Sequence, residues 1–530
     1  MCGILAVLYS GKGRYPISKI KAGVAKIVAR GPEGTRITEL ANATFGFTRL
    51  AINGLSDAGM QPFANDGLAW MCNGEIYNAA AIEKQLGYVS KSASDCEVLG
   101  ALWSATKDPV AFCRALDGVF CIVLHDDVSN TYMVARDPYG VRPLYYAEDR
   151  FYGMLFASER KALEAVVDEH VKVYEFPPGE VWSISQGIVK KEVYHTVPWI
   201  KSQGLSGDEL RAGVRSSLVT AVEKRLMTER PVAALLSGGL DSSLIAALVQ
   251  QMLKARGLPP LKTFSIGMKG SSDLKHASEV AEWIGSDHRE LVVTADEMFA
   301  AIPDVIRDVE SYDITTIRAS VGNWLIAREV TKTSCKVVFN GDGSDEVWGS
   351  YLYFFKAPND YAFEADSCRL LKEMHRYDVL RSDRSISSHG LEARTPFLDK
   401  QFVATAMAVP TVLRRPSATR IEKNLLREAF DEGLLPGSVL WRKKEAFSDG
   451  VSTQEKSWFQ EIQERVLGLI PADWETQAAA FAEPRPKTPE AFYYRSLYEK
   501  FYTKTGDYWP FWMPRWSPET SDPSARTLTL

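Results

Sequence analysis

The chain has 530 residues, too many for one ordinary hydrophobic core and enough for two to four domains. Hydrophobic residues make up 45% and charged residues 24%, close to the globular average, which excludes a disordered or fibrous chain. The 62 Lys and Arg against 67 Asp and Glu give a net charge of −5, which argues against binding of nucleic acid or an anionic membrane through a basic face.

The apolar runs and the cysteines exclude further classes of protein. No apolar run approaches the roughly 20 residues of a membrane-spanning helix, and the N-terminus lacks the basic and apolar regions of a secretory signal. The 7 cysteines are scattered and make no disulfide framework, and the 7 histidines show no zinc spacing. We therefore expect a soluble, multidomain enzyme of the cytoplasm, without nucleic-acid or membrane partners.

The first half of the chain is predicted to form antiparallel sheets in an α+β layout, because short apolar or alternating runs stand between turn residues. Helical periodicity interrupts these runs at Lys19–Arg30, where Ser18 is the expected N-cap, and at Asp95–Ala105. The polar segment 186–207 is expected to be a connection. The predicted strands are Gly3–Tyr9, Thr44–Leu50, Leu68–Asn73, Gly118–Asp126, Thr131–Arg136, Phe151–Ala157 and Glu180–Ile184.

Strands and helices alternate after this connection, which predicts a parallel doubly wound sheet. The chain is mostly helical beyond residue 340, and the segment 508–530, with Trp509, Trp512, Trp516 and four prolines, is expected to lie over the surface. The predicted helices are Asp208–Met227, Asp241–Met252 and Asp273–Ile284, and the predicted strands are Val232–Leu236, Leu261–Gly267 and Lys336–Asn340.

Cys2 stands between Met1 and the small residue Gly3, a position where the initiating methionine is readily removed. Removal leaves Cys2 with a free α-amine of pKa about 7.7–8.0, which can serve as general base for its own thiol without a histidine. Taken alone, a cysteine at position 2 is more often an ordinary residue that opens a strand, so the motifs that follow decide between the two interpretations.

Several polar residues of the first half have the character of a site for a free amino acid. The Asn73 amide and the Gly74 backbone N–H at a tight turn are parts of an oxyanion hole. Glu75 and Asp95 are candidate partners of an α-ammonium group, and Arg49 can bind an α-carboxylate in bidentate fashion. Each residue alone also fits a plain hairpin turn or a surface charge, whereas together they would aim an amino-acid side chain at the thiol.

Five segments in order resemble the class II (N-terminal nucleophile) glutamine amidotransferase domain: Met1–Ile4, Arg30–Glu33, Asn73–Asn78, Ser94–Glu97 and Arg136–Gly140. The resemblance implies that Cys2 attacks the glutamine carboxamide, releases ammonia and leaves a thioester that water hydrolyses. It further implies that Asn73 and Gly74 form the oxyanion hole. The implied glutamine-binding residues are Arg49, Leu50, Ala51, Ile52, Asn53, Asn73, Gly74, Glu75 and Asp95.

A glycine-rich loop, Ser237–Ser243, joins a predicted buried strand to a helix. Its glycines let backbone N–H groups approach phosphate oxygens, and the helix N-terminus favours an anion. No Gly-Lys-Ser/Thr follows, so the loop is not a Walker loop. Asp241 makes sense beside phosphates if it holds Mg²⁺. A serine N-cap on a tight turn is the alternative interpretation.

A second acidic loop, Asn340–Glu346, follows another predicted strand. Because the carboxyl ends of parallel strands meet at one crevice, two such loops suit a nucleotide with Mg²⁺. Asp342, Asp345 and Glu346 offer more acid than phosphate binding needs, so at least one is a candidate proton acceptor or metal ligand. An acidic, solvated turn is the alternative.

These loops resemble the synthetase domain of the glutamine-hydrolysing asparagine synthetase family. The resemblance implies that aspartate attacks the α-phosphate of ATP to give β-aspartyl-AMP and pyrophosphate, and that ammonia then displaces AMP to give asparagine. It covers essentially the whole chain, since further matching motifs run almost to the C-terminus: Ala221–Leu226, Tyr312–Ser320, Gly390–Asp399, Trp441–Gly450 and Asp522–Leu528.

The resemblance also implies roles for individual residues. Asp241 and Asp345 would hold Mg²⁺, and Lys444 would neutralise phosphate charge, although a solvated lysine in a basic run is the alternative for Lys444. Thr315, Thr316 and Arg318 are expected at the aspartate or phosphate end. The expected ATP and pyrophosphate contacts are Leu236, Ser237, Gly238, Gly239, Asp241, Ser242, Ser243, Ile266, Asn340 and Gly341, and the expected catalytic residues are Cys2, Asn73, Gly74, Asp342 and Lys444.

The second loop departs from the family pattern, which is usually Ser-Gly-Glu-Gly-Ser-Asp-Glu. In the family the glutamate supports formation of the intermediate and is expected to deprotonate the incoming ammonia, whereas this chain has Asp342 there. The shorter side chain loses on the order of 1 Å of reach, and a misplacement of that size costs roughly 100-fold. Either the site has compensated, or synthesis is slow, or the carboxylate acceptor differs.

The sequence therefore predicts two domains. Residues 2–200 form an Ntn-hydrolase-like antiparallel β-sandwich flanked by helices, and residues 206–530 form an α/β domain similar to the adenine nucleotide alpha hydrolases. The predicted enzyme uses ATP with Mg²⁺, glutamine and aspartate, passes ammonia through an apolar passage between its domains, and is a homodimer. The alternatives are a related amide-forming enzyme with another carboxylate acceptor and a non-catalytic glutamine sensor.

Overall fold

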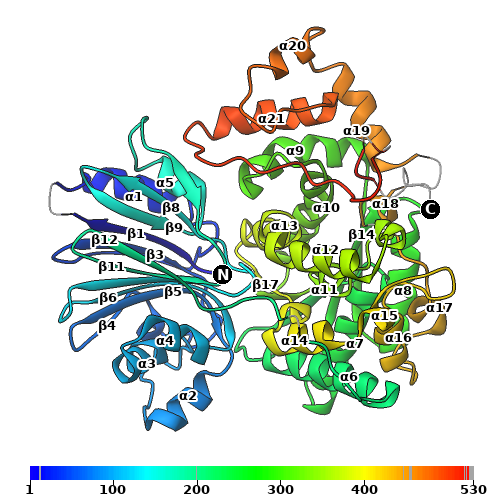
Figure 1. Cartoon of the computed structure of the whole chain (residues 1–530), viewed down its shortest axis with the longest axis horizontal. Helices are drawn as coiled ribbons and strands as arrows, with labels where there is room; N and C mark the ends of the chain where they lie inside the picture. Colours follow the sequence, from blue (N-terminus) through cyan, green and yellow to red (C-terminus); the bar gives the residue numbers. More distant parts are fainter. Residues whose placement is uncertain are drawn as a thin grey trace.

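A computed structural model describes residues 1–10, 13–198, 200–445, 447–452, 456–518, 520 and 522–524. Figure 1 shows two halves side by side, a blue-to-cyan N-terminal half and a green-to-red C-terminal half, with the N-terminus between them. No helix in the described ranges is long and apolar enough to cross a membrane.

The N-terminal half contains two antiparallel six-stranded sheets, with strand orders β10-β8-β9-β1-β3-β2 and β12-β11-β7-β6-β5-β4. The strands are β1 (Gly3–Tyr9), β2 (Gly34–Glu39), β3 (Ala43–Arg49), β4 (Phe63–Asn65), β5 (Leu68–Ile76), β6 (Gly118–Asp126), β7 (Thr131–Arg136), β8 (Tyr145–Asp149), β9 (Gly153–Ala157), β10 (Val173–Glu175), β11 (Glu180–Ser185) and β12 (Ile188–Val193). The helices are α1 (Ile17–Ala25), α2 (Ala79–Leu86), α3 (Val98–Thr106), α4 (Pro109–Ala115) and α5 (Arg160–Glu164).

These two sheets pack face to face, and helices cover both outer faces. The layer between the sheets is built from large apolar side chains such as Phe45, Phe47, Met71 and Trp182. Helices α1 and α5 lie on the β1 sheet, and α3 and α4 lie on the β5 sheet. Because side chains of a strand alternate between its two faces, the central strands must be apolar on both. The sandwich flanked by helices confirms the predicted α+β fold.

The C-terminal half contains a parallel five-stranded sheet with the order β15-β14-β13-β16-β17. Its strands are β13 (Val232–Leu235), β14 (Lys262–Met268), β15 (Asp287–Val293), β16 (Val337–Phe339) and β17 (Glu392–Arg394). Helices cover both faces, as expected for a doubly wound sheet. The chain runs outward from β13 to β15 on one side and continues with β16 on the other, so the strand order reverses between β13 and β16, a position where ligands bind in such folds.

The helices of this half dominate the chain after β16. The α-helices are α6 (Gly207–Lys224), α7 (Leu240–Ala255), α8 (Ser272–Ile284), α9 (Ala295–Val309), α10 (Ile314–Val330), α11 (Ser344–Trp348), α12 (Asp360–Glu373), α13 (Asp378–Ser387), α14 (Lys400–Ala408), α15 (Thr411–Arg414), α16 (Asn424–Ala429), α17 (Gly437–Leu440), α18 (Phe447–Gly450), α19 (Trp458–Leu467), α20 (Trp474–Ala478) and α21 (Pro489–Phe501). Short 3₁₀ turns occupy Asp57–Gly59, Leu352–Lys356, Met374–Arg376 and Pro396–Leu398.

Some local predictions were wrong. Helix α1 begins at Ile17 after Pro16, so Ser18 lies inside the helix and does not cap it, and the helix ends at Ala25. The expected connection at 186–207 contains strand β12, whose residues include Lys190, Lys191 and Glu192. Such charges are typical of an edge strand, where they discourage pairing with another chain, and they hide the apolar alternation.

The described part of the segment after residue 508 has neither helix nor strand and packs on the C-terminal half. The Tyr312 hydroxyl donates to the Trp509 carbonyl at 2.7 Å, and the Trp512 N–H donates to Asp313 Oδ1 at 2.7 Å. The expected irregular surface segment is thus present over its described residues, and it reaches the large cavity described below.

The two halves meet at a buried, charged interface. The Arg30 guanidinium lies 2.7 Å from Asp383 on α13, and Arg384 on the same helix lies 2.8 Å from Glu159. All four side chains are buried. Since a buried charge without its partner is costly, these pairs fix the position of one half against the other.

Candidate active sites

Cys2 lies immediately before β1, at the boundary between the two halves (Figure 1). Its thiol is 3.6 Å from the Leu50 carbonyl, and burial raises the pKa of the thiol to about 11. Met1 is buried ahead of it, with its α-amine 3.8 Å from Glu392. Burial lowers the pKa of that amine to about 6. A thiol in this state is protonated at neutral pH, so Cys2 needs a base close to its sulfur.

Asn73 and Gly74 are neighbours inside strand β5, which contacts β1, so the tight turn expected at these two residues was wrong. The Asn73 amide nitrogen is 3.4 Å from the Ser158 hydroxyl, while its buried amide oxygen has no hydrogen-bond partner among the residues that the structure describes. A Cβ on Gly74 would stand 2.1 Å from the Val119 carbonyl on β6, so only glycine fits here. The structure thus places a side-chain amide and a tightly packed backbone position in one strand, the donor types of an oxyanion hole.

The predicted glutamine-binding side chains converge on one polar cluster. Asn53 Nδ2 donates to Glu75 Oε2 at 2.8 Å and lies 3.5 Å from Asp95 Oδ1, so both carboxylates face one donor. Burial raises the pKa of Glu75 and of Asp95. Arg394, from the other half, lies 3.2 Å from Glu75. Two facing carboxylates with polar hydrogen donors around them are suited to an ammonium group.

The other predicted glutamine-binding residues surround this cluster. Arg49 is buried and donates to the Ser56 carbonyl at 2.8 Å and to the Gly54 carbonyl. The Ala51 N–H donates to Glu33 at 2.8 Å, and the Ile52 carbonyl accepts from the Glu229 N–H at 3.1 Å. Leu50, Ala51 and Ile52 are buried. These groups are engaged with the protein itself, so their contact with an amino acid stays a prediction.

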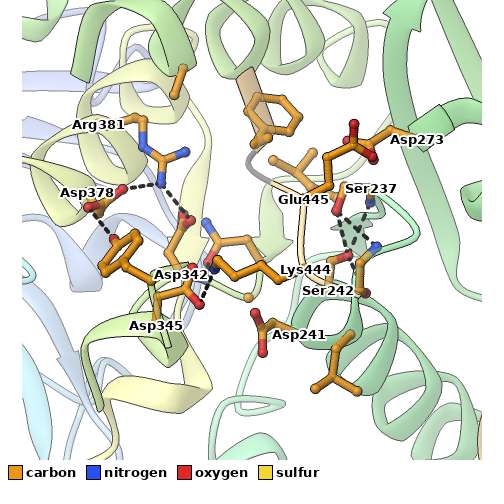
Figure 2. A pocket seen from close by; sticks show the side chains of 18 of the residues that line it. Ser237, Asp241, Ser242, Asp273, Asp342, Asp345, Asp378, Arg381, Lys444 and Glu445 are labelled. Atoms are coloured by element: carbon orange, nitrogen blue, oxygen red, sulfur yellow. Dashed lines mark hydrogen bonds and ion pairs between the residues drawn. The ribbon is translucent and has the colours of Figure 1, made fainter. Parts of the chain in front are cut away.

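A cavity of about 290 Å³ opens at the carboxyl ends of β13 and β16. Figure 2 shows Ser237, Asp241 and Ser242 on one side of it and Asp342, Asp345 and Arg381 on the other. The predicted loop residues that line the cavity are Leu236, Ser237, Gly239, Asp241, Ser242, Ile266, Asn340, Gly341, Asp342, Asp345 and Lys444. The reversal of strand order therefore brings both predicted loops to one site, as expected for a nucleotide crevice.

The first loop is held open toward the cavity by its own hydrogen bonds. The Ser237 and Ser242 hydroxyls are 3.0 Å apart, and the Ser237 N–H donates to Ser242 Oγ at 3.1 Å. Gly238 has a φ of 71°, a conformation that side chains disfavour. Gly238 and Ser243 are not among the residues that line the cavity: the Gly238 carbonyl accepts from Arg442, and Ser243 is fully buried.

In the second loop, Asp342 pairs with an arginine that it shares with Asp378. Asp342 is 3.3 Å from Arg381 on α13, which also holds Asp378 at 2.6 Å. Burial raises the pKa of Asp342 despite the Arg381 charge. Asn340 donates to the Ser382 hydroxyl at 2.7 Å, which fixes the start of the loop to the same helix. A carboxyl group with a raised pKa at the edge of a cavity is suited to proton transfer.

Asp241 and Asp345 from the two loops share a cation. Lys423 Nζ lies 2.6 Å from Asp241 Oδ2 and 2.6 Å from Asp345 Oδ1, and Lys444 pairs with Asp345 as well. Although burial works against it, the two ammonium groups hold the pKa of Asp345 below its usual range. Asp345 therefore stays charged, as a divalent cation or a phosphate-bound metal requires.

The donor set at Asp241 and Asp345 fits Mg²⁺ in the company of phosphates. The described residues include no group of three or more His, Cys, Asp and Glu side chains arranged to hold a metal. Mg²⁺ commonly binds through one or two carboxylates plus substrate phosphates and waters, so two aspartates suffice beside a nucleotide.

Thr315, Thr316 and Arg318 stand at the start of α10. Both threonine hydroxyls donate to Asp313, at 2.6 and 2.9 Å. Arg318 makes two-pronged ion pairs with Glu490 and Asp522, at 2.5 and 2.7 Å. Thr315 and Arg318 line the cavity, and Thr316 does not. Their donors are directed at protein carboxylates, so a role at the aspartate or phosphate end stays a prediction.

Sequence reasoning missed several charged residues of the cavity. Lys423, Asp378 and Arg381 come from segments that showed only helical or basic character. Tyr351, also missed, donates to Glu346 at 2.7 Å and to Asp378 at 2.9 Å. No pattern in the sequence pointed to Lys423, which adopts a left-handed φ of 58° immediately before α16.

Comparison with known families assigns each half of the chain to a family model. Residues 1–198 match the model of the Glutamine amidotransferase domain, and residues 213–366 and 358–521 match that of Asparagine synthase. The chain is 40% identical to "Asparagine synthetase [glutamine-hydrolyzing]" from Cricetulus griseus over 567 residues, covering 100% of this chain and 99% of that protein.

Two further relatives carry the same name. The Homo sapiens protein is 40% identical over 565 residues and the Gallus gallus protein 39% over 564 residues, with 100% of this chain covered in both and 99% and 98% of the relatives. A chain that matches these relatives along its whole length belongs to the family of glutamine-hydrolysing asparagine synthetases.

Proposed function

We propose that the protein converts ATP, L-aspartate, L-glutamine and water into AMP, diphosphate, L-asparagine and L-glutamate. One chain contains Cys2, in the same half as the polar cluster of Glu75 and Asp95, and a cavity between two loops that carry Asp241 and Asp345. This combination is the observation that carries the proposal. The family relationship supports the same reaction.

The glutaminase step begins with removal of Met1. The α-amine of Cys2 then takes the thiol proton, and the thiolate attacks the glutamine amide carbon. Asn73 and Gly74 stabilise the oxyanion, and Glu75 and Asp95 bind the substrate ammonium group while Arg49 and the backbone of 50–53 position the remaining groups. The C–N bond breaks and ammonia leaves, and water hydrolyses the Cys2 thioester to glutamate. The buried, protonated thiol behind Met1 supports this order, because its one hydrogen-bond partner among the described residues is the Leu50 carbonyl.

The synthetase step takes place in the cavity between β13 and β16. The aspartate β-carboxylate attacks the α-phosphate of ATP, and the bond to the β-phosphate breaks to release diphosphate. The Ser237–Ser243 loop binds the diphosphate, and Lys444 balances its charge. Mg²⁺ bound by Asp241 and Asp345 would neutralise charge on the phosphates. Ammonia then attacks the β-aspartyl carbonyl, AMP leaves, and Asp342 accepts the ammonia proton, a role that its raised pKa supports.

We further propose that residues 2–200 and 206–530 are the two functional units, that ammonia moves between them through an apolar passage, and that the enzyme is a cytoplasmic homodimer. Free thiols at all seven cysteines support a reducing compartment. Light scattering on the purified protein tests the dimer, with twice the chain mass as the expected result.

Asp342 supports a second candidate function, the synthesis of an amide from a carboxylate acceptor other than aspartate. Its carboxylate is held by Arg381 on the far side of the cavity from the Ser237 loop (Figure 2), and its shorter side chain leaves more room for the acceptor than glutamate would. A screen of carboxylates by diphosphate release decides between aspartate and a longer or bulkier acid.

Product analysis with Mg²⁺-ATP, aspartate and glutamine is the direct test. We expect asparagine, AMP and diphosphate together with glutamate. The Cys2→Ala variant should lose glutamine-dependent synthesis and keep synthesis from ammonium chloride, because only the first step needs the thiol. Glutamate without AMP would reject aspartate as the acceptor, and loss of both activities in a folded Cys2→Ala protein would reject the two-site scheme.

A further inference from the structure

Lys423 occupies the centre of the synthetase cavity although no sequence motif singles it out. Its side chain is only 3% exposed, and its Nζ touches Asp241 from the first loop and Asp345 from the second, each at 2.6 Å. The two partners are separated from it by 182 and 78 residues in the chain. Lys423 is thus the one group that contacts both proposed metal ligands among the residues that the structure describes.

The position of the ammonium group matches the position of a bound cation. Both carboxylate oxygens lie 2.6 Å from Nζ, whereas Mg²⁺–oxygen distances are about 2.0–2.1 Å. A shift of about half an ångström by each carboxylate would therefore replace the ammonium with a metal ion. Ser344 donates at 2.7 Å to Asp241 Oδ1, the oxygen that does not contact Lys423. Ser350 donates at 2.5 Å to Asp345 Oδ1, the same oxygen that Lys423 contacts. The two serine hydroxyls thus hold both carboxylates in place around this point.

The charges around Lys423 explain why an ammonium group stands at this point. Asp241 and Asp345 carry two negative charges, and Lys423 and Lys444 carry two positive charges. Two carboxylates from separate loops repel each other and would not stay together in a buried site without a cation. With Lys423 in place, the charge of the Asp241–Asp345 pair is neutralised before any nucleotide binds. A free metal ion therefore binds the pair only weakly.

We propose that Lys423 is an exchangeable internal cation: it holds the Asp241–Asp345 pair in the nucleotide-free enzyme and yields the pair to a divalent cation that arrives with the nucleotide. This inference rests on the proposed function of the cavity. After the exchange, the Lys423 ammonium turns to the phosphate oxygens in the same cavity. This exchange makes metal binding depend on the nucleotide. A metal ion that arrives alone must displace the Lys423 ammonium with no phosphate charge to receive that ammonium.

Metal binding without nucleotide tests the proposal directly. Mn²⁺ is titrated into the full-length, nucleotide-free protein and free Mn²⁺ is followed by electron paramagnetic resonance. We expect weak binding by the native protein and binding about tenfold tighter or more by Lys423→Met, because the variant keeps the side-chain length and leaves one uncompensated negative charge. Lys423→Arg keeps the charge and should bind as weakly as the native protein.

Two further variants test whether the gain in Mn²⁺ affinity comes from the Asp241–Asp345 pair. Lys443→Met removes one positive charge from an exposed position of the same cavity and should leave Mn²⁺ binding within about twofold of native. The double variant Asp345→Asn/Lys423→Met should lose the tighter binding. A purely structural role for Lys423 predicts no gain of metal affinity in any variant, and equal Mn²⁺ affinity of native protein and folded Lys423→Met would overturn the proposal.

The Mn²⁺ titration distinguishes failure of this proposal from failure of the proposed function. Mn²⁺ binding needs neither nucleotide nor turnover, whereas an incorrect function would appear as missing asparagine in the native enzyme. Glutamine hydrolysis, which takes place in the other half, reports that each variant is folded. Should Lys423→Met fail to fold, Lys423→Gln carries the same expectation, because it also removes the charge and can donate to one carboxylate.

Discussion

At the scale of single residues, Asp342 is the position where this chain departs from its family's usual loop sequence. Its carboxylate lies 3.3 Å from Arg381, and burial raises its pKa. The contact indicates how the shorter side chain is accommodated, because Arg381, on the same side of the cavity as Asp342 (Figure 2), anchors the carboxylate. A proton acceptor is then present although the reach of glutamate is lost.

Replacing Asp342 by Asn tests this role. We expect ammonia-dependent asparagine synthesis to fall by about 10²–10⁴-fold, the usual contribution of a positioned acid or base. Glutamine hydrolysis should be unchanged, since the two sites lie in different halves. Asp342→Glu is the matched control and should stay within about tenfold of native activity. Synthesis by Asp342→Asn at the native rate would show that the proton leaves by another route.

At the scale of elements, the three-residue strand β17 is the structural connection between the two sites. The Arg394 carbonyl accepts the Asn340 N–H of the second loop at 3.1 Å, while the Arg394 side chain lies 3.2 Å from Glu75 in the glutamine cluster. Glu392 on the same strand faces the Met1 amine. One short edge strand therefore contributes to both active sites.

Replacing Arg394 by Met tests the dependence of the glutamine site on this strand. Arg394 opposes the effect of burial on the pKa of Glu75, so without it Glu75 stays protonated to higher pH and binds an ammonium group less well. We expect the KM for glutamine to rise about tenfold or more, the usual effect of losing a hydrogen bond to a charged group. The KM for ammonium in the synthesis reaction should change little.

Arg394→Lys serves as the control because it keeps the charge. An equal rise of both KM values in Arg394→Met would point to general disruption of β17 instead of a specific effect on Glu75.

The elements also show what sequence could and could not predict. Strands β1, β6 and β7 begin and end where periodicity predicted, because each is apolar, regular and bounded by turn residues. Strand β17 has three residues and no visible period, and β12 hides its period under edge charges. The cavity loops were predicted from glycine and acid spacing. Lys423 was not, because its role comes from contacts across 182 residues that only the folded sheet creates.

At the scale of the whole molecule, the halves are joined by buried ion pairs centred on helix α13. Asp383 lies 2.7 Å from Arg30 and 3.5 Å from Arg142, and the Arg30 Nε donates to the Cys2 carbonyl at 3.0 Å. The interface thus positions the nucleophile as well as the two halves. Polar and charged groups surround Met1 here, while Leu391 and Ala393 supply apolar contacts, so the apolar passage remains a prediction.

Replacing Asp383 by Asn should loosen this interface without removing a group that takes part in either reaction. Removal of one member of a buried ion pair commonly costs about 3–5 kcal/mol, since the partner charges are left uncompensated. Here Arg30 and Arg142 lose their shared carboxylate. We expect ammonia to escape between the halves, so that the ratio of glutamate to asparagine formed rises above the native ratio while synthesis from added ammonium is retained.

Glu192→Gln on β12 is the matched control, because it removes a negative charge from an exposed pair with Lys190 at 2.9 Å. Exposed pairs contribute little to stability, so this variant should keep the native product ratio. If Asp383→Asn also kept it, the charged interface would be unimportant for ammonia transfer, and the transfer would depend on contacts outside α13. A raised ratio confined to Asp383→Asn would instead show that retention of ammonia depends on the same ion pairs that hold Cys2 in place.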